Sequence, residues 1–228
     1  MVKEEGEFDG FITRDGELIS IEDTDRVSAI FLRTSDVDSA VETLWHLVAE
    51  CYGAGYFSAA CRYIEKIIPL VETPGQKAEC FLRMGGAMEE MKDYPAALAA
   101  YVRAFELPPE RNDMWYFLNN NRGYCLNQAG RSEEAELYCR AAIELEPERH
   151  NAHKNLGISL AQQGRYAEAA ECCIRATRLC PSDARALSFL DDLFKGHKEL
   201  IEEVPDFLAQ LHECHELVQG SEGEPLLQ

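Results

Sequence analysis

The sequence predicts an all-α fold built from antiparallel helix pairs that repeat along the chain. Three observations support it: landmarks that recur at a constant offset of 34 residues, small residues where two helices would cross, and turn or stop residues between helices. The recurring landmarks are Gly123 and Gly157, Ala135 and Ala169, Ala142 and Ala176, and Pro147 and Pro181. Unrelated helices would have no reason to keep this offset, so the sequence is that of a repeat protein.

Each landmark has a role in packing one helix pair. Gly123, Ala135 and Ala142 let two helices approach closely, because none of them places a bulky side chain at the crossing. Gly130 falls in the turn between the two helices. Pro147 ends the unit, because proline cannot continue the second helix.

This pattern resembles the tetratricopeptide repeat family over about residues 41 to 183. The resemblance assigns four repeats within residues 35–183, and these span 41–74, 78–111, 116–149 and 150–183. Repeat 1 is degenerate, because Val48 and Ile67 stand where glycine and alanine are usual, as expected of a terminal unit. Asn112 to Trp115 is an insertion before repeat 3. In this family such pairs wind into a right-handed α-α superhelix, which we therefore expect here.

Residues 1–34 are expected to form an N-terminal arm. Between Phe8 and Ile21, two β-prone runs flank Asp15-Gly16, an arrangement typical of a β-hairpin. A lone hairpin is marginally stable in water. The arm should therefore dock on the helices, pair with a second copy as a homodimer, or stay partly disordered. Val27 to Arg33 could add a third strand or an extended connector.

The first helix is expected to begin near Asp36, with Ser35 as its N-cap. A second helix should cover about residues 57 to 71, and Pro74-Gly75 should separate the first two repeats.

After the repeats, residues 184–219 are expected to form a C-terminal pair of capping helices. Such a pair covers the apolar face that an unpaired last repeat would expose. Pro205 should kink or restart the second of these helices. Residues 220–228 are expected to be a disordered tail.

The charge of the chain is concentrated at its ends. The net charge is −19, and residues 1–40 hold 4 basic and 11 acidic residues, while residues 183–228 hold 3 and 11. Nucleic acids and anionic membranes need a basic surface, so neither is expected as a partner. The acidic start does not resemble a signal peptide, and no apolar run approaches the ~18 residues of a membrane span. We expect a cytoplasmic protein.

The nine cysteines are interpreted as reduced packing residues. Cys139 and Cys173 occupy a slot that usually carries an aromatic side chain, and the cluster Cys172-Cys173-Cys180 contains no Cys-x-x-Cys pair. His212 and His215 would share one helical face but lack further ligands. No metal site, no cofactor and no catalytic motif is predicted, so the chain is not expected to be an enzyme.

The family resemblance also implies which side chains point into the concave groove. Carried onto this chain, the groove positions selected as candidate binding residues are Arg83, Phe117, Asn120, Asn121, Tyr124, Asn127, Gln128, Asn151, Lys154, Asn155, Ile158, Gln162, Arg185 and Phe189. The groove is rich in amides.

Asn121 and Asn155 occupy the same position in consecutive repeats. Adjacent helices lie about 8–10 Å apart, close to three residues of an extended strand at about 3.3 Å each. Because an amide both donates and accepts, these residues could form a ladder that holds a peptide backbone. The alternative is that they cap helices or face solvent. Asn155 and Arg185 also fit part of the family's carboxylate clamp, which Phe189 leaves incomplete.

The predicted function is a non-enzymatic protein-protein interaction module that binds an extended peptide or a helix of a partner protein in the groove. The alternative is an acidic cytoplasmic chaperone similar to the class II chaperones of bacterial type III secretion. The N-terminal hairpin, the fourth repeat and the C-terminal cap depart from that class. A further possibility is that the N-terminal arm occupies the groove of its own or a neighbouring chain.

Overall fold

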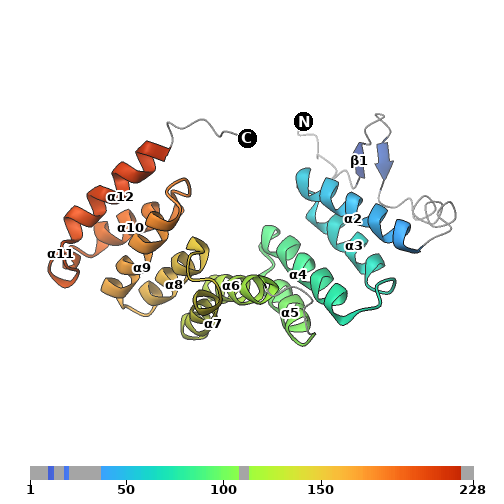
Figure 1. Cartoon of the computed structure of the whole chain (residues 1–228), viewed down its shortest axis with the longest axis horizontal. Helices are drawn as coiled ribbons and strands as arrows, with labels where there is room; N and C mark the ends of the chain where they lie inside the picture. The colour runs from blue at the N-terminus through green and yellow to red at the C-terminus, as the bar shows by residue number, and fades with distance from the viewer. Residues whose placement is uncertain (1–9, 13–17, 21–36, 108–112, 222–228) are drawn as a thin grey trace, which may run out of the picture. The chain divides into compact units, whose positions relative to one another are not determined.

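The computed structural model describes residues 10–12, 18–20, 37–107 and 113–221, which contain two short strands and eleven helices (Figure 1). The chain divides into two compact units, Met1–Glu110 and Arg111–Gln228, and each unit is described by itself. The predicted all-helical repeat fold is confirmed. Within the described ranges, every helix is too short or too polar to cross a membrane.

The N-terminal arm contains the predicted strand pair. Strand β1 (Gly10–Ile12) runs antiparallel to β2 (Leu18–Ser20), with Phe11 opposite Ile19. The proposed Asp15-Gly16 turn and the segment from Val27 to Arg33 lie outside the described residues.

The first unit continues with α2 (Val37–Gly53), α3 (Phe57–Ile67), α4 (Pro74–Glu90) and α5 (Tyr94–Phe105). Each helix packs on the next, so two pairs stack through α3 and α4. The Thr73 side chain accepts from the Gln76 backbone N–H and Gln76 bonds back to Thr73, forming a capping box. Pro74-Gly75 therefore begins a helix rather than separating two repeats, because proline is well tolerated in the first turn.

Gly85 explains how α4 and α5 approach each other. A Cβ atom at this position would fall within the ring of Tyr101, which is fully buried and donates its hydroxyl to Glu89 at 2.8 Å. The small residue in the first helix is therefore required by a large ring in the second.

The second unit comprises seven described helices. These are α6 (Asp113–Gln128), α7 (Ser132–Leu145), α8 (His150–Gln162), α9 (Tyr166–Leu179), α10 (Arg185–Gly196), α11 (Leu200–Glu203) and α12 (Phe207–Ser221). Gly130 and Gly164 adopt the positive φ values of tight turns, 71° and 78°, as expected for helix ends. Asp113, Met114 and Trp115, expected as part of an insertion, belong to α6.

The last three helices cover the end of the second unit. α11 and α12 are separated at Pro205, as predicted, and both pack on α9. Arg178 of α9 pairs with Glu213 at 2.5 Å, and His215 of α12 bonds Asp191 of α10 at 3.0 Å. Helix α12 continues to Ser221, two residues beyond the expected end at 219.

Candidate functional site

The candidate groove residues of the second unit lie on α6, α8 and α10, and the structure separates them by exposure. Asn120, Asn127, Lys154 and Asn155 are buried, at 9% exposure or less. Phe117, Asn121, Tyr124, Asn151, Ile158 and Phe189 are half-buried, whereas Gln128, Gln162 and Arg185 are exposed. Arg83 is exposed and belongs to the first unit.

The buried amides join α6 to α8. Asn155 Nδ2 donates to Asn120 Oδ1 at 3.0 Å, and Asn127 Nδ2 donates to the Asn155 carbonyl at 2.8 Å. The Ser159 hydroxyl donates to Asn127 Oδ1 at 2.8 Å. These side chains therefore hold two consecutive first helices in register.

The same hydrogen bonds connect the two residues of the predicted asparagine ladder to each other inside the protein. Asn120 Nδ2 donates to Asn121 Oδ1 at 3.0 Å, so Asn120 links the two ladder positions, Asn121 and Asn155. The Asn155 nitrogen is used inside the protein, while its Oδ1 is buried without a hydrogen-bond partner among the described residues. A buried acceptor without a donor costs about 1–3 kcal/mol. This oxygen is thus the part of Asn155 that still needs a donor.

A charged cluster adjoins Asn155 at the start of α8 and α10. Lys154 Nζ donates to Asn151 Oδ1 at 3.1 Å, and Arg185 Nη2 donates to the same oxygen at 3.3 Å. Asp183 accepts two hydrogen bonds from the Arg185 guanidinium, at 2.7 and 2.6 Å, and pairs with His150 at 2.9 Å. The cluster therefore contains the basic groups of Lys154 and Arg185 and the carboxylate of Asp183.

Two pKa shifts describe this cluster. Burial, with a further contribution from Arg185, lowers the pKa of Lys154 below its ordinary value. The hydrogen bonds from Arg185 outweigh the effect of burial and hold the pKa of Asp183 well below its usual range. Lys154 therefore has a desolvated ammonium group, which an additional anionic group nearby would stabilise.

Aromatic side chains lie beside the amides near the start of α6. Phe117 packs edge-to-face with Tyr116, and the Arg149 guanidinium lies 4.7 Å from the Tyr116 ring centroid and 4.9 Å from that of Phe117. The α6 and α8 surface thus combines aromatic rings, amides and cationic side chains.

Arg83 has its contacts within the first unit. Its guanidinium lies 5.3 Å from the Trp45 ring centroid and 2.7 Å from the Glu79 carboxylate. The Tyr52 hydroxyl donates to the Arg83 carbonyl at 2.5 Å.

Sequence reasoning did not single out Ser159, Asp183 or Trp45. Ser159 follows a predicted groove position by one residue and faces the helix contact, which residue type alone does not reveal. Asp183 could have been found, because an acidic residue just before a helix that begins with arginine often bonds that first turn. Trp45 belongs to α2, in the repeat whose landmarks are degenerate.

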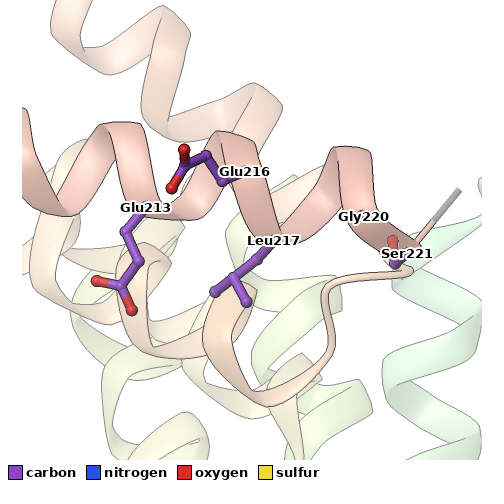
Figure 2. A pocket seen from close by; sticks show the side chains of 5 residues that line it. All are labelled: Glu213, Glu216, Leu217, Gly220 and Ser221. Atoms are coloured by element: carbon purple, nitrogen blue, oxygen red, sulfur yellow. The ribbon is translucent and has the colours of Figure 1, made fainter. Parts of the chain in front are cut away.

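Two surface depressions lie away from these residues. One is lined by Glu213, Glu216, Leu217, Gly220 and Ser221 of α12, and Figure 2 shows the side chains of Glu213 and Glu216 extending in different directions from that helix. Glu213 is already paired with Arg178. The other lies on the first unit, where the Arg103 guanidinium covers the Phe81 ring at 4.0 Å. Neither depression brings polar groups together toward a common ligand.

None of the nine cysteines is in a disulfide, and only Cys172 and Cys180 are partly exposed. Burial raises the pKa of Cys51 and Cys61 to about 11 and that of Cys139 to about 12. Protonated thiols of this kind are poor nucleophiles and poor metal ligands. In the part of the chain that the structure describes, no three potential metal-ligating side chains converge.

A tetratricopeptide repeat model matches residues 89–148 and 128–184. The photosystem I assembly protein Ycf3 of Acaryochloris marina is 32% identical over 114 residues, which are 50% of this chain and 68% of that protein. The chain belongs to the tetratricopeptide repeat (TPR) family. Small glutamine-rich tetratricopeptide repeat-containing protein 2 of Mycosarcoma maydis is 35% identical over 107 residues, 47% of this TPR chain and 29% of that protein. The chain spans less than a third of the length of each of the first curated relatives that it matches.

Solved TPR structures share this fold. MamA of Desulfovibrio magneticus RS-1 aligns with a TM-score of 0.63 at 16% identity, covering 81% of this chain and 97% of that one. YrrB, a TPR protein with an unusual peptide-binding site, aligns with a TM-score of 0.57 at 20% identity, covering 86% and 97%.

Proposed function

We propose that this TPR protein binds a segment of another protein, extended or helical, along α6, α8 and α10 of its second unit. The observation that carries the proposal is the Oδ1 of Asn155, which accepts no hydrogen bond from the described residues, in a side chain only 3% exposed. A backbone N–H of a bound segment is a suitable donor for this oxygen, if a small side-chain movement opens access to it.

The surroundings of Asn155 support a polypeptide ligand. Arg185 and Lys154 supply donors and positive charge. Phe117 and Tyr124 of α6 supply half-buried aromatic surface. A surface that offers polar, charged and apolar contacts together suits a polypeptide segment. The peptide-binding description of YrrB, a structural neighbour, points the same way.

The test begins by selecting, from a displayed library, peptides that bind the immobilised full-length chain. Their affinities are then measured by calorimetry for the wild type and for Arg185→Ala, whose side chain is 68% exposed. We expect the affinity to fall about fivefold, the loss typical of one partly screened charged contact.

Arg175→Ala is the matched control, because this arginine of α9 is also exposed and paired, here with Glu148. Equal affinity of the selected peptides for the wild type and Arg185→Ala would contradict the proposed surface. So would an equal loss in both variants.

A second candidate function is a chaperone-like role in assembly, favoured by the match to the assembly protein Ycf3. A chaperone should keep an aggregation-prone client soluble at equimolar concentration, whereas a simple adaptor should bind it without this effect. Light scattering of the identified partner, with and without the chain, separates the two functions.

A further inference from the structure

The first unit carries a surface of its own on α2 and α4. Residues at helical spacing share one side of each helix. We refer to these residues as the first-unit face: Glu42, Trp45, Ala49 and Tyr52 of α2, and Glu79, Arg83, Gly86 and Glu90 of α4.

Contacts between the two helices make this face continuous. The Tyr52 hydroxyl donates to the Arg83 carbonyl, and a Cβ atom at Gly86 would lie 3.4 Å from the same hydroxyl. The Arg83 side chain lies over the Trp45 ring. Two aromatic side chains therefore adjoin bare backbone at Gly86, where another chain could approach closely.

The charges of the face are unbalanced. It holds three carboxylates and a single guanidinium, that of Arg83, which Glu79 already neutralises. Glu42 and Glu90 are exposed, and neither forms an ion pair with any described residue. An incoming cation would therefore meet two carboxylates that have no competing partner in the described part of the chain.

Arg83 shows which chemistry suits this face. Its guanidinium lies near an aromatic ring and a carboxylate at once, and both groups stabilise a cation. The face thus already contains one bound cation, supplied by the chain itself.

We propose that the first-unit face binds a cationic segment of a partner protein. Lysine or arginine side chains of that segment pair with Glu42 and Glu90, and a neighbouring apolar side chain contacts Trp45 and Tyr52 above Gly86. Arg83 is one of the predicted groove positions, so this face belongs to the first unit's share of those positions, whereas Lys154 and Arg185 of the second unit favour an anionic group. The protein then has two binding faces of opposite charge preference.

The chain has two tryptophans, so Trp115→Phe leaves Trp45 as the sole indole reporter. The probe is a synthetic peptide with lysines three and four residues apart around a leucine. The control peptide has glutamate in place of each lysine. The lysine peptide should change Trp45 fluorescence saturably and bind more weakly as salt rises. The glutamate peptide should leave the fluorescence unchanged.

The pair Glu42→Gln and Glu90→Gln, in the same Trp115→Phe background, should weaken the lysine peptide about fivefold, as expected for two exposed ion pairs. The control pair is Glu65→Gln and Glu106→Gln, which removes equal charge from exposed positions off the face and should keep the affinity.

Equal weakening by both pairs would overturn the proposal, because it would reveal only attraction to overall charge. Binding of the glutamate peptide with equal affinity would do so too. Arg185→Ala should not alter this binding, so the result is independent of the surface proposed on the second unit.

Discussion

In each unit, the first helix of one repeat contacts the first helix of the next, but the two units make this contact with different side chains. In the second unit, buried amides bond α6 to α8, and Asn120, Asn127 and Asn155 are all at most 9% exposed. In the first unit, α2 and α4 meet through the aromatic side chains of Trp45 and Tyr52. One repeat fold therefore supports either a polar or an aromatic junction, and the surface left for a partner differs accordingly.

The packing inside each helix pair differs as well. In the first unit the landmark Gly85 faces the ring of Tyr101, whereas in the second unit Gly123 and Gly157 face the smaller thiols of Cys139 and Cys173. A rigid ring and a thiol tolerate an added methyl group differently. The comparison can therefore be tested one unit at a time, with Trp45 reporting on the first unit and Trp115 on the second.

The largest effect is expected for Gly85→Ala. The added methyl group would collide with the Tyr101 ring, which cannot move easily because it is buried and bonded to Glu89. Overpacking of this kind costs about 1–3 kcal/mol. Urea unfolding of a Trp115→Phe background, followed by Trp45 fluorescence, should show the loss in the first unit.

Gly86→Ala is its control, because the added atom would lie at an ordinary 3.4 Å from the nearest atom and alanine favours helix by up to about 1 kcal/mol. If both variants were equally stable, close approach would not explain the landmark glycine.

A smaller loss is expected for Ser159→Ala in the second unit. The Ser159 hydroxyl, fully buried, donates to Asn127 Oδ1, and removing it leaves that acceptor without this donor. The expected cost is about 1–2 kcal/mol. Trp115 fluorescence in a Trp45→Phe background measures it, and the exposed Ser188→Ala should cost less than about 0.5 kcal/mol. Similar stabilities of the two serine variants would argue against a stabilising role for the amide junction.

The smallest effect is a pH dependence confined to the second unit. Burial acts to raise the pKa of Glu136, but hydrogen bonds from Gln163, Arg140 and Arg165 outweigh it and hold the pKa below its ordinary value. A lowered folded-state pKa means that the stabilisation is present above the unfolded value of about 4.3 and is lost as the pH falls through the folded value.

The urea midpoint reported by Trp115 should therefore drop between about pH 5 and about pH 3. Glu136→Gln should flatten this dependence, whereas Glu144→Gln, exposed on the same helix, should leave it in place. An unchanged slope in Glu136→Gln would assign the pH effect to other carboxylates.

Much of the fold could be predicted from local pattern. The offset of 34 residues between landmarks such as Gly123 and Gly157 predicted paired helices, and Pro205 predicted a restart in the cap. These signals are local, because small residues at a crossing and proline at a helix end act through their immediate neighbours. Pro74 was misread for the same reason, since proline both ends helices and begins them.

The candidate site was less predictable. The family resemblance implied that Asn120, Asn121, Asn127 and Asn155 share one surface of the repeats, but it did not distinguish an amide that binds a partner from one that bonds the neighbouring helix. That choice depends on distances between residues about 30 positions apart, such as the 3.0 Å contact of Asn155 with Asn120.

The sequence alone determined that helix pairs repeat and which residues allow them to cross, because these properties follow from side-chain size and periodicity. Only the tertiary structure decided that the Asn155 nitrogen is used internally while its oxygen lacks a partner among the described residues. It also decided that Trp45 and Glu79 surround Arg83. Hydrogen bonds and cation–π contacts depend on orientation to within a few tenths of an ångström, which only the packing of the helices sets.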